Sequence, residues 1–136
     1  MPFEPWHLEW LSVPQPIALT MEYGQMLSSA GPAYSVFAGS TVVACAGVVQ
    51  FWQGRSQAWA LISEHLPRYQ KSVHKAVKKF LQFYQVKRLE CVVDPRHEAA
   101  IRWAERLGFE SESVMPSYTP NGDLQLMMVR LQPWLR

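Results

Sequence analysis

The stretch Asp94–Phe109, DPRHEAAIRWAERLGF, carries the signals for one complete helix, the turn before it and the strand after it. Its apolar residues recur at spacings of three and four, which predicts an amphipathic helix with one face against a core. These residues are Ala99, Ala100, Trp103, Ala104 and Leu107. Gly108 is expected to end the helix in the left-handed conformation that glycine adopts at low cost. Asp94-Pro95 ends a strand predicted over Leu89–Val93, so the stretch joins two strands through a helix.

Turn signals and apolar periodicity divide the rest of the chain into further elements. The expected helices are Ile17–Ser28 and Val73–Tyr84, and the other expected strands are Tyr34–Ala38, Thr41–Trp52, Gln57–Ile62, Phe109–Tyr118 and Asp123–Leu131. Ser72 is a candidate N-cap of the second helix, and Ser63 is the candidate for an earlier start. The order predicts an α/β fold with a mixed central sheet, an antiparallel first half and a strand–helix–strand crossover in the middle.

The composition fits one globular domain over residues 1–136. The chain is 49% hydrophobic, 12% aromatic and 18% charged, which excludes a disordered protein. No apolar run approaches the roughly 20 residues that a membrane-spanning helix needs, and the first residues lack a signal-peptide pattern. Cys45 and Cys91 lie in apolar runs, which indicates buried thiols in a reducing compartment rather than a disulfide. We therefore expect a soluble, cytoplasmic protein.

The element order and part of the quoted stretch resemble the GNAT acyltransferase family. The matching residues are Ala100-Ile101, Trp103 and Leu107-Gly108-Phe109, and the resemblance extends over roughly residues 41 to 131. It implies the GNAT-like acyl-CoA N-acyltransferase fold, with helices on both faces of the sheet. It also implies transfer of an acetyl group from acetyl-CoA to an amine.

The same resemblance implies a cofactor site at the end of the third strand and the start of the helix after it. Backbone groups near Leu61 and Ile62 would bind the pantetheine arm, and the helix N-terminus would bind the pyrophosphate. The family's loop has small residues, whereas residues 66–75 read LPRYQKSVHK without a glycine. If Arg68 is aligned with the first position of the family's loop motif, the cofactor-binding residues are Arg68, Lys71, Ser72 and Val73. The alternative alignment places Gln70 at that first position. The family's asparagine falls at His97.

The residues that would transfer protons are also changed. The family's tyrosine, which often protonates the leaving thiolate, falls at Ala104, so Tyr118 or Tyr69 would have to replace it. A general base must take a proton from the amine, and Glu64 or His65 follows the third strand at the expected place.

Glu90 and Asp94, at the two ends of the central strand, are the other candidate bases. For Asp94 the alternative is an ordinary turn-forming residue before Pro95. No His, Cys, Asp or Glu pair has the spacing of a metal site.

Basic residues gather between Arg68 and Arg88. This segment holds 7 of the 13 basic residues and no acidic one, although the net charge of the chain is only +2. The interpretations are a solvated helix face, capture of CoA phosphates, or contact with nucleic acid or an acidic protein. The aromatic residues Phe80, Phe83 and Tyr84 are expected largely on the core side, which weakens a base-stacking interpretation.

The second functional hypothesis is a non-catalytic protein that keeps the fold. The degenerate loop is similar to that of small GNAT-like proteins of tailed bacteriophages, including internal virion proteins, which implies a bacterial host's cytoplasm or a virion. The partner would then be a virion or host protein, while the enzyme would act on an amine or a protein substrate. Trp6, Trp10 and Trp134 near the two ends indicate a partner surface or a homodimer. No membrane partner is expected.

Overall fold

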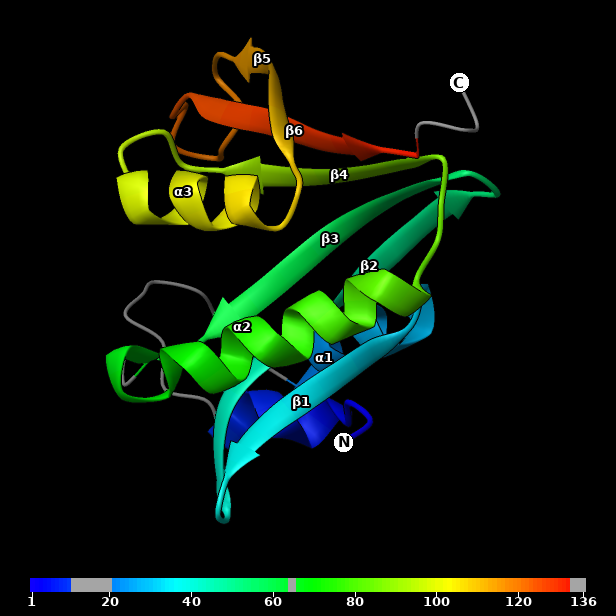
Figure 1. The fold of residues 1–136 in the computed structure, drawn as a ribbon, viewed down its shortest axis with the longest axis vertical. Coiled ribbons are helices and arrows are strands. Elements are labelled where there is room, and N and C mark those ends of the chain that lie inside the picture. The colour runs from blue at the N-terminus through cyan, green and yellow to red at the C-terminus, as the bar shows by residue number, and fades with distance from the viewer. Residues whose placement is uncertain (11–20, 64–65, 133–136) are drawn as a thin grey trace. The chain divides into compact units, whose positions relative to one another are not determined.

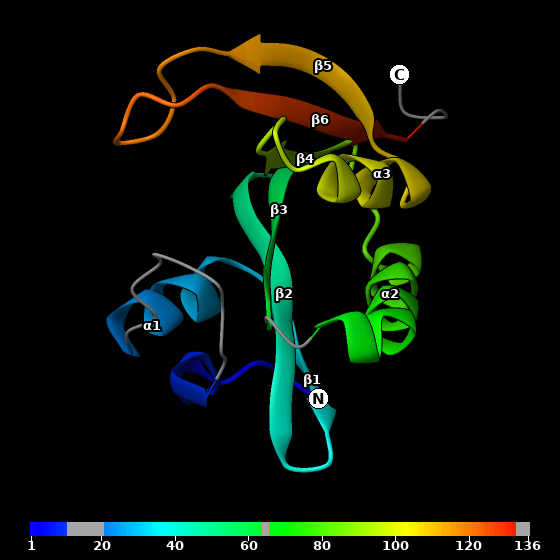
Figure 2. The same cartoon turned by 90° about the vertical axis from the view of Figure 1, so that its left-hand side faces the viewer.

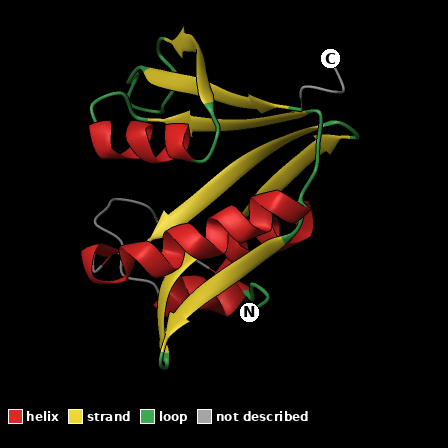
Figure 3. Ribbon diagram, in the orientation of Figure 1, coloured by secondary structure: helices red, strands yellow, loops and turns green. Residues whose placement is uncertain are grey.

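The computed structural model describes residues 1–10, 21–63 and 66–132, and the chain divides into two compact units. Unit 1 comprises residues 1–50 and 58–84, and unit 2 comprises residues 51–57 and 85–136. The elements are η1 (Pro5–Trp10), α1 (Met21–Ala30), β1 (Ala33–Ala38), β2 (Thr41–Trp52), β3 (Arg55–Ile62), α2 (Leu66–Phe83), β4 (Arg88–Val93), α3 (Glu98–Arg106), β5 (Glu110–Met115) and β6 (Gln125–Leu131). Their hydrogen-bonded order, β1-β2-β3-β4-β6-β5, confirms the mixed α/β architecture (Figures 1 and 3).

In unit 1, two helices cover opposite faces of the first strands. β1 pairs with β2 in antiparallel register from Ala33↔Gly47 to Ala38↔Thr41, and α1 and α2 lie on either side of this pair (Figure 2). β2 is buried from Val42 to Val48 because both of its faces are covered. Phe3, Leu27, Val42, Cys45 and Leu61 form the core beneath α1. The expected antiparallel first half with helices on both faces is therefore present.

The helix α2 begins seven residues before the predicted start at Val73. The prediction of Ser72 as the N-cap is wrong, since Ser72 lies inside the helix, and the alternative of an earlier start is confirmed. The first turn of α2 escaped the periodicity argument because its sequence, LPRYQ, carries no regular apolar stripe. Val73 is 1% exposed and packs into the core from this helix.

Unit 2 is built around β4. Its first three residues pair in parallel with residues 55–57 of β3, and all six pair in antiparallel register with β6 from Arg88↔Leu131 to Val93↔Leu126. β5 forms the sheet edge beside β6. α3 follows β4 and ends at Arg106, and Gly108, just after the C-cap Leu107, has a φ of +96°, which confirms the predicted left-handed stop.

Several boundaries differ from the sequence prediction. β5 ends at Met115 rather than at Tyr118, and β6 begins at Gln125 rather than at Asp123, because a longer connection spans residues 116–124. The helix predicted from Ile17 is described only from Met21, and its earlier residues lie outside the described part. In the part of the chain that the structure describes, no helix is both long and apolar enough to span a membrane.

Candidate functional site

The end of β3, where the sequence placed Leu61 and Ile62, has a strand edge with few partners. The parallel pairs with β4 described here comprise Arg55↔Arg88, Ser56↔Leu89 and Gln57↔Glu90, while β3 continues to Ile62. Its other edge belongs to β2, which is its neighbour in the sheet. Leu61 is buried in the core of unit 1 and Ile62 is half-buried, so it is the backbone of this segment that can meet a ligand. Unpaired backbone N–H and C=O groups are suitable partners for an amide-containing chain such as pantetheine.

Three residues separate the end of β3 from the start of α2, and this short connection changes the expected phosphate site. The first four N–H groups of a helix have no intrahelical acceptor. Within α2 these include residues 66–68, of which Pro67 has no N–H, so the N–H groups of Leu66 and Arg68 remain as donors. The N–H groups of Lys71, Ser72 and Val73 are instead used by the i to i−4 bonds of the helix.

The expectation that these three residues form a loop around the phosphates is therefore corrected. Lys71 and Ser72 are exposed and can contribute side chains, whereas the Val73 side chain is in the core. Arg68 lies in the first turn of α2. Glu64 and His65, the candidate bases, lie outside the described residues.

Tyr69, the alternative acid, lies in α2 of unit 1, and the remaining predicted site residues belong to unit 2. His97 precedes the first residue of α3, is exposed, and makes no side-chain capping hydrogen bond. Ala104 is 6% exposed on the buried face of α3, so no acid stands at the place of the family's tyrosine. Tyr118 is half-exposed in the connection between β5 and β6, where its N–H donates to the Asp123 carbonyl at 3.1 Å. The structure thus divides the predicted site residues between the two units.

Asp94 forms the turn before α3. Its Oδ1 accepts the Arg96 backbone N–H at 2.9 Å, and its carboxylate also accepts two hydrogen bonds from the Arg96 guanidinium. These bonds lower the pKa of Asp94 to about 2, so it stays ionised and is a weak base. The turn-forming interpretation of this residue is confirmed.

Glu90, the other candidate base, holds an ion-pair cluster that sequence reasoning missed. Its buried carboxylate accepts hydrogen bonds from Arg55 Nε at 2.7 Å, Arg55 Nη2 at 3.0 Å and Arg88 Nε at 2.5 Å. Arg88 also binds Glu112 through both terminal nitrogens. Residues 55, 88 and 90 share one face of unit 2, because paired strand residues lie on the same face and alternate along each strand. The alternation of Arg88 and Glu90 was the available sequence signal, but Arg55 is 35 residues away from Glu90.

This cluster excludes Glu90 as a general base. The hydrogen bonds from Arg55, and then those from Arg88, lower the pKa of Glu90, although its burial opposes them. A base with a lowered pKa and occupied lone pairs has little tendency to take up a proton. The Arg55 guanidinium carbon also lies 4.5 Å from the ring centre of Phe51 and 4.8 Å from that of Trp52. The cluster therefore fixes the positions of the two arginines against Glu90 and the aromatic rings, and it does not transfer protons.

A second polar cluster is enclosed in unit 1. The Glu4 N–H donates to His7 Nδ1 at 3.0 Å, so this nitrogen is an acceptor and Ser35 Oγ donates to it at 2.7 Å. Ser35 Oγ is in turn 3.4 Å from Cys45 Sγ. Burial lowers the pKa of His7, with the nearby Glu4 opposing it, and raises the pKa of Cys45 to about 11. All three side chains are inaccessible, so the cluster is structural.

Cys91 is likewise not a nucleophile. Burial raises its pKa to about 12, so its thiol is protonated at neutral pH, as is that of Cys45. Both cysteines are free. Among the described residues, no group of three His, Cys, Asp or Glu side chains could hold a metal ion.

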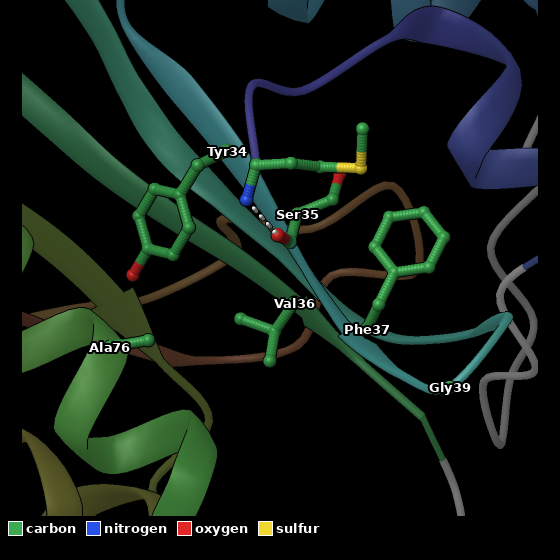
Figure 4. A pocket seen from close by; sticks show the side chains of 7 residues that line it. Tyr34, Ser35, Val36, Phe37, Gly39 and Ala76 are labelled. Atoms are coloured by element: carbon green, nitrogen blue, oxygen red, sulfur yellow. Dashed lines mark hydrogen bonds between the residues drawn. The ribbon is translucent and has the colours of Figure 1, made fainter.

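An open pocket of about 470 Å³ lies beside β1 in unit 1, and its lining includes none of the predicted site residues. It is lined by Met1, Tyr34, Ser35, Val36, Phe37, Gly39 and Ala76 (Figure 4). The amino group of Met1 donates to the Ser35 carbonyl at 3.0 Å, and the Tyr34 hydroxyl is buried and has no hydrogen-bond partner among the described residues. Burial raises the pKa of Tyr34, so the pocket presents no ionised side chain.

Comparison with known proteins gives the fold. No protein-family model matches the chain, and no curated protein sequence does. Solved structures match over most of the chain: Ard1 of Thermoplasma volcanium has a TM-score of 0.74 at 14% identity, covering 96% of this chain and 95% of its own. A variant of the spermidine N-acetyltransferase of Vibrio cholerae has a TM-score of 0.68 at 11% identity, covering 96% and 93%. The chain has the GNAT acetyltransferase fold.

A third neighbour, the IAA acetyltransferase of Bacillus cereus, agrees with this assignment. Its TM-score is 0.67 at 12% identity, and the match covers 83% of this chain and 85% of the neighbour. The GNAT fold expected from the element order and from Leu107-Gly108-Phe109 is therefore confirmed. Because sequence identity is so low, the activity of this GNAT-fold chain has to be argued from its own residues.

Proposed function

We propose that this chain is an N-acetyltransferase that transfers an acetyl group from acetyl-CoA to an amine. The observation that carries the proposal is the direct succession of β3 and α2. A strand edge with few partners runs to Ile62, and after three intervening residues α2 begins, where the N–H groups of Leu66 and Arg68 have no acceptor within the helix. The strand edge can hydrogen-bond to the amide groups of the pantetheine arm, and the helix N-terminus can bind the pyrophosphate.

The residues at the start of α2 would bind the pyrophosphate of acetyl-CoA without the glycine-containing loop of the family. The donors would be the N–H groups of Leu66 and Arg68 at the start of α2, and the exposed Lys71 adds positive charge about one turn further along. When bound, acetyl-CoA supplies an activated thioester. In the reaction, the amine nitrogen forms a bond to the acetyl carbon, the carbon–sulfur bond breaks, the amine loses a proton and the thiolate gains one.

For the proton transfers we propose Glu64 or His65 as the base that takes the proton from the amine. Glu90 and Asp94 are unsuited, because their carboxylates are held ionised by arginines. Tyr118 is the proposed acid, since its ring is half-exposed and Ala104 offers no proton. His97 is exposed before α3 and would contact the ligand without a part in proton transfer.

Calorimetric titration with acetyl-CoA tests this proposal. Binding is expected, and Lys71→Ala is expected to weaken it about two- to fivefold, as for the loss of one exposed charge contact. Lys79→Ala is the matched control, because it removes another exposed lysine about 12 Å further along the same helix. Absence of heat at high micromolar acetyl-CoA, or equal effects of the two substitutions, would refute the proposed cofactor site.

The second candidate is a GNAT-fold protein that binds a partner without catalysis. It is favoured by Ala104 at the tyrosine position and by the lack of a glycine loop before α2. The likeness to small bacteriophage proteins, including internal virion proteins, points in the same direction. Incubation with labelled acetyl-CoA and a panel of amines separates the candidates. Acetylated product supports the enzyme, whereas binding without product supports the second candidate.

A further inference from the structure

The outer face of α2 carries a continuous positive stripe. Four exposed lysines form it, and we call them the lysine stripe: Lys71, Lys75, Lys78 and Lys79. At 100° per residue these positions fall within an arc of about 100°, and at 1.5 Å per residue they extend over about 12 Å. The lysines therefore lie side by side along one line of the helix surface.

Nothing on this helix neutralises the stripe. α2 contains no acidic residue, and among the described residues none of the four lysines takes part in an ion pair. Surface lysines elsewhere in proteins are commonly balanced by carboxylates three or four positions away. Four adjacent, uncompensated ammonium groups make a surface that attracts a polyanion.

An exposed aromatic ring stands at the end of this stripe. The inner side of α2 is formed by Phe80, which packs on Tyr34 with ring centres 5.2 Å apart and stacks on Tyr84 at 5.6 Å. Phe83, in contrast, is 78% exposed. The expectation that Phe83 lies on the core side is therefore wrong. Phe83 follows Lys79 by four residues, so the two side chains are neighbours on the helix surface.

We propose that the lysine stripe and Phe83 bind a single-stranded nucleic acid. The lysines would contact successive phosphates, and the Phe83 ring would stack on a base. Bases of a duplex are already stacked on each other, so an exposed ring favours a single strand. An acidic protein segment would use the lysines, but it would leave the phenyl ring without a matching flat partner. The lysine stripe shares Lys71 with the proposed acetyl-CoA site, but binding of a nucleic acid along the stripe does not require acetyl transfer.

Fluorescence anisotropy with labelled oligothymidine tests the proposal across 50 to 200 mM salt. Each phosphate contact to a single strand contributes about −0.7 to the slope of log K against log salt, so four contacts predict about −2.8. Lys78→Ala is expected to weaken binding and to reduce the slope by about 0.7. Phe83→Ala is expected to weaken binding about 5- to 150-fold without changing the slope, because stacking releases no counterions.

Two matched variants control for general effects of charge and aromatic surface. Arg102→Ala removes a cation that is 66% exposed on α3, and Trp52→Ala removes an aromatic ring that is 63% exposed at the end of β2. Neither should change binding. The proposal is overturned if wild type fails to bind at 50 mM salt, or if the controls lose as much affinity as Lys78→Ala and Phe83→Ala. It is also overturned if polyglutamate displaces the oligonucleotide at equal charge concentration, since that result indicates an acidic protein partner.

Discussion

Replacing Glu90 with glutamine tests whether the ion-pair cluster stabilises unit 2. The carboxylate is 2% exposed and accepts three guanidinium hydrogen bonds, while Arg55 and Arg88 are each about one-third exposed. Glutamine keeps the shape but removes the charge, and its amide group turns a donor toward the arginine donors. A hydrogen bond to a charged group contributes roughly 1.5–3 kcal/mol, and partial exposure of the arginines weakens each one. We therefore expect Glu90→Gln to lower the free energy of unfolding by about 2–3 kcal/mol in total.

Urea denaturation followed by tryptophan fluorescence measures this loss. Glu112→Gln is the matched control, because Glu112 binds the same Arg88 from a side chain that is 39% exposed. Its loss should stay below about 1 kcal/mol, as for other exposed ion pairs. Equal losses for the two variants would show that burial of Glu90 does not strengthen its contacts, and would refute the reasoning.

The pH dependence gives the same prediction an independent check. The pKa of Glu90 is lower in the folded state than the roughly 4.3 of an unfolded glutamate, so the unfolded state binds more protons in this range. The stabilisation is fully present above the unfolded pKa and is lost as the pH falls through the folded one. The difference in unfolding free energy between wild type and Glu90→Gln should therefore narrow below about pH 4. A difference that stays constant into acid would mean that the lost stability comes from packing.

Three further predictions concern unit 1 and the thiols. Phe80→Ala should lower the free energy of unfolding by about 2–4 kcal/mol, because Phe80 packs against the rings of Tyr34 and Tyr84. Phe83→Ala should lower it by less than about 0.5 kcal/mol, because Phe83 is exposed. Equal losses for the two variants would place Phe83 in the core. Gly47→Ala should destabilise the β1–β2 pair by about 1–3 kcal/mol, because a Cβ at Gly47 would lie 2.6 Å from both the Ala33 Cβ and the Pro32 carbonyl oxygen. An unchanged midpoint of urea denaturation would contradict this. Cys45 and Cys91 should resist a thiol reagent at neutral pH in the folded protein and react with it in urea, because burial raises the pKa of both thiols. Rapid labelling of the folded protein would instead show that one of these thiols is reactive.

Much of the fold could be predicted because its signals are local. β2 was predicted with the bounds Thr41–Trp52 that the structure shows, and the stop at Gly108 follows from glycine's access to positive φ. The start of α2 was missed because its first turn has no apolar stripe, so nothing local distinguishes it from a loop. That difference matters for the site, since it converts the expected phosphate loop into helix.

The candidate site was predictable only in outline. Turn signals placed Leu61 and Ile62 at the end of the third strand, and the resemblance to the GNAT family made this strand end the expected cofactor site. The partners of Glu90 could not be foreseen, since Arg55 and Glu112 come from other strands and meet Glu90 or Arg88 only through the sheet register. A carboxylate that looked like a candidate base is thereby held as an ion-pair partner.

By itself the sequence determined the order of the elements, the turns at its glycines and the concentration of positive charge in one helix. These depend on residues within a few positions of each other, where backbone preferences and apolar spacing act directly. The tertiary structure alone decided that Glu90 is buried between two arginines and that Phe83 points out while Phe80 points in. Burial depends on which distant strand or helix covers a side chain, and no local pattern in this chain records that.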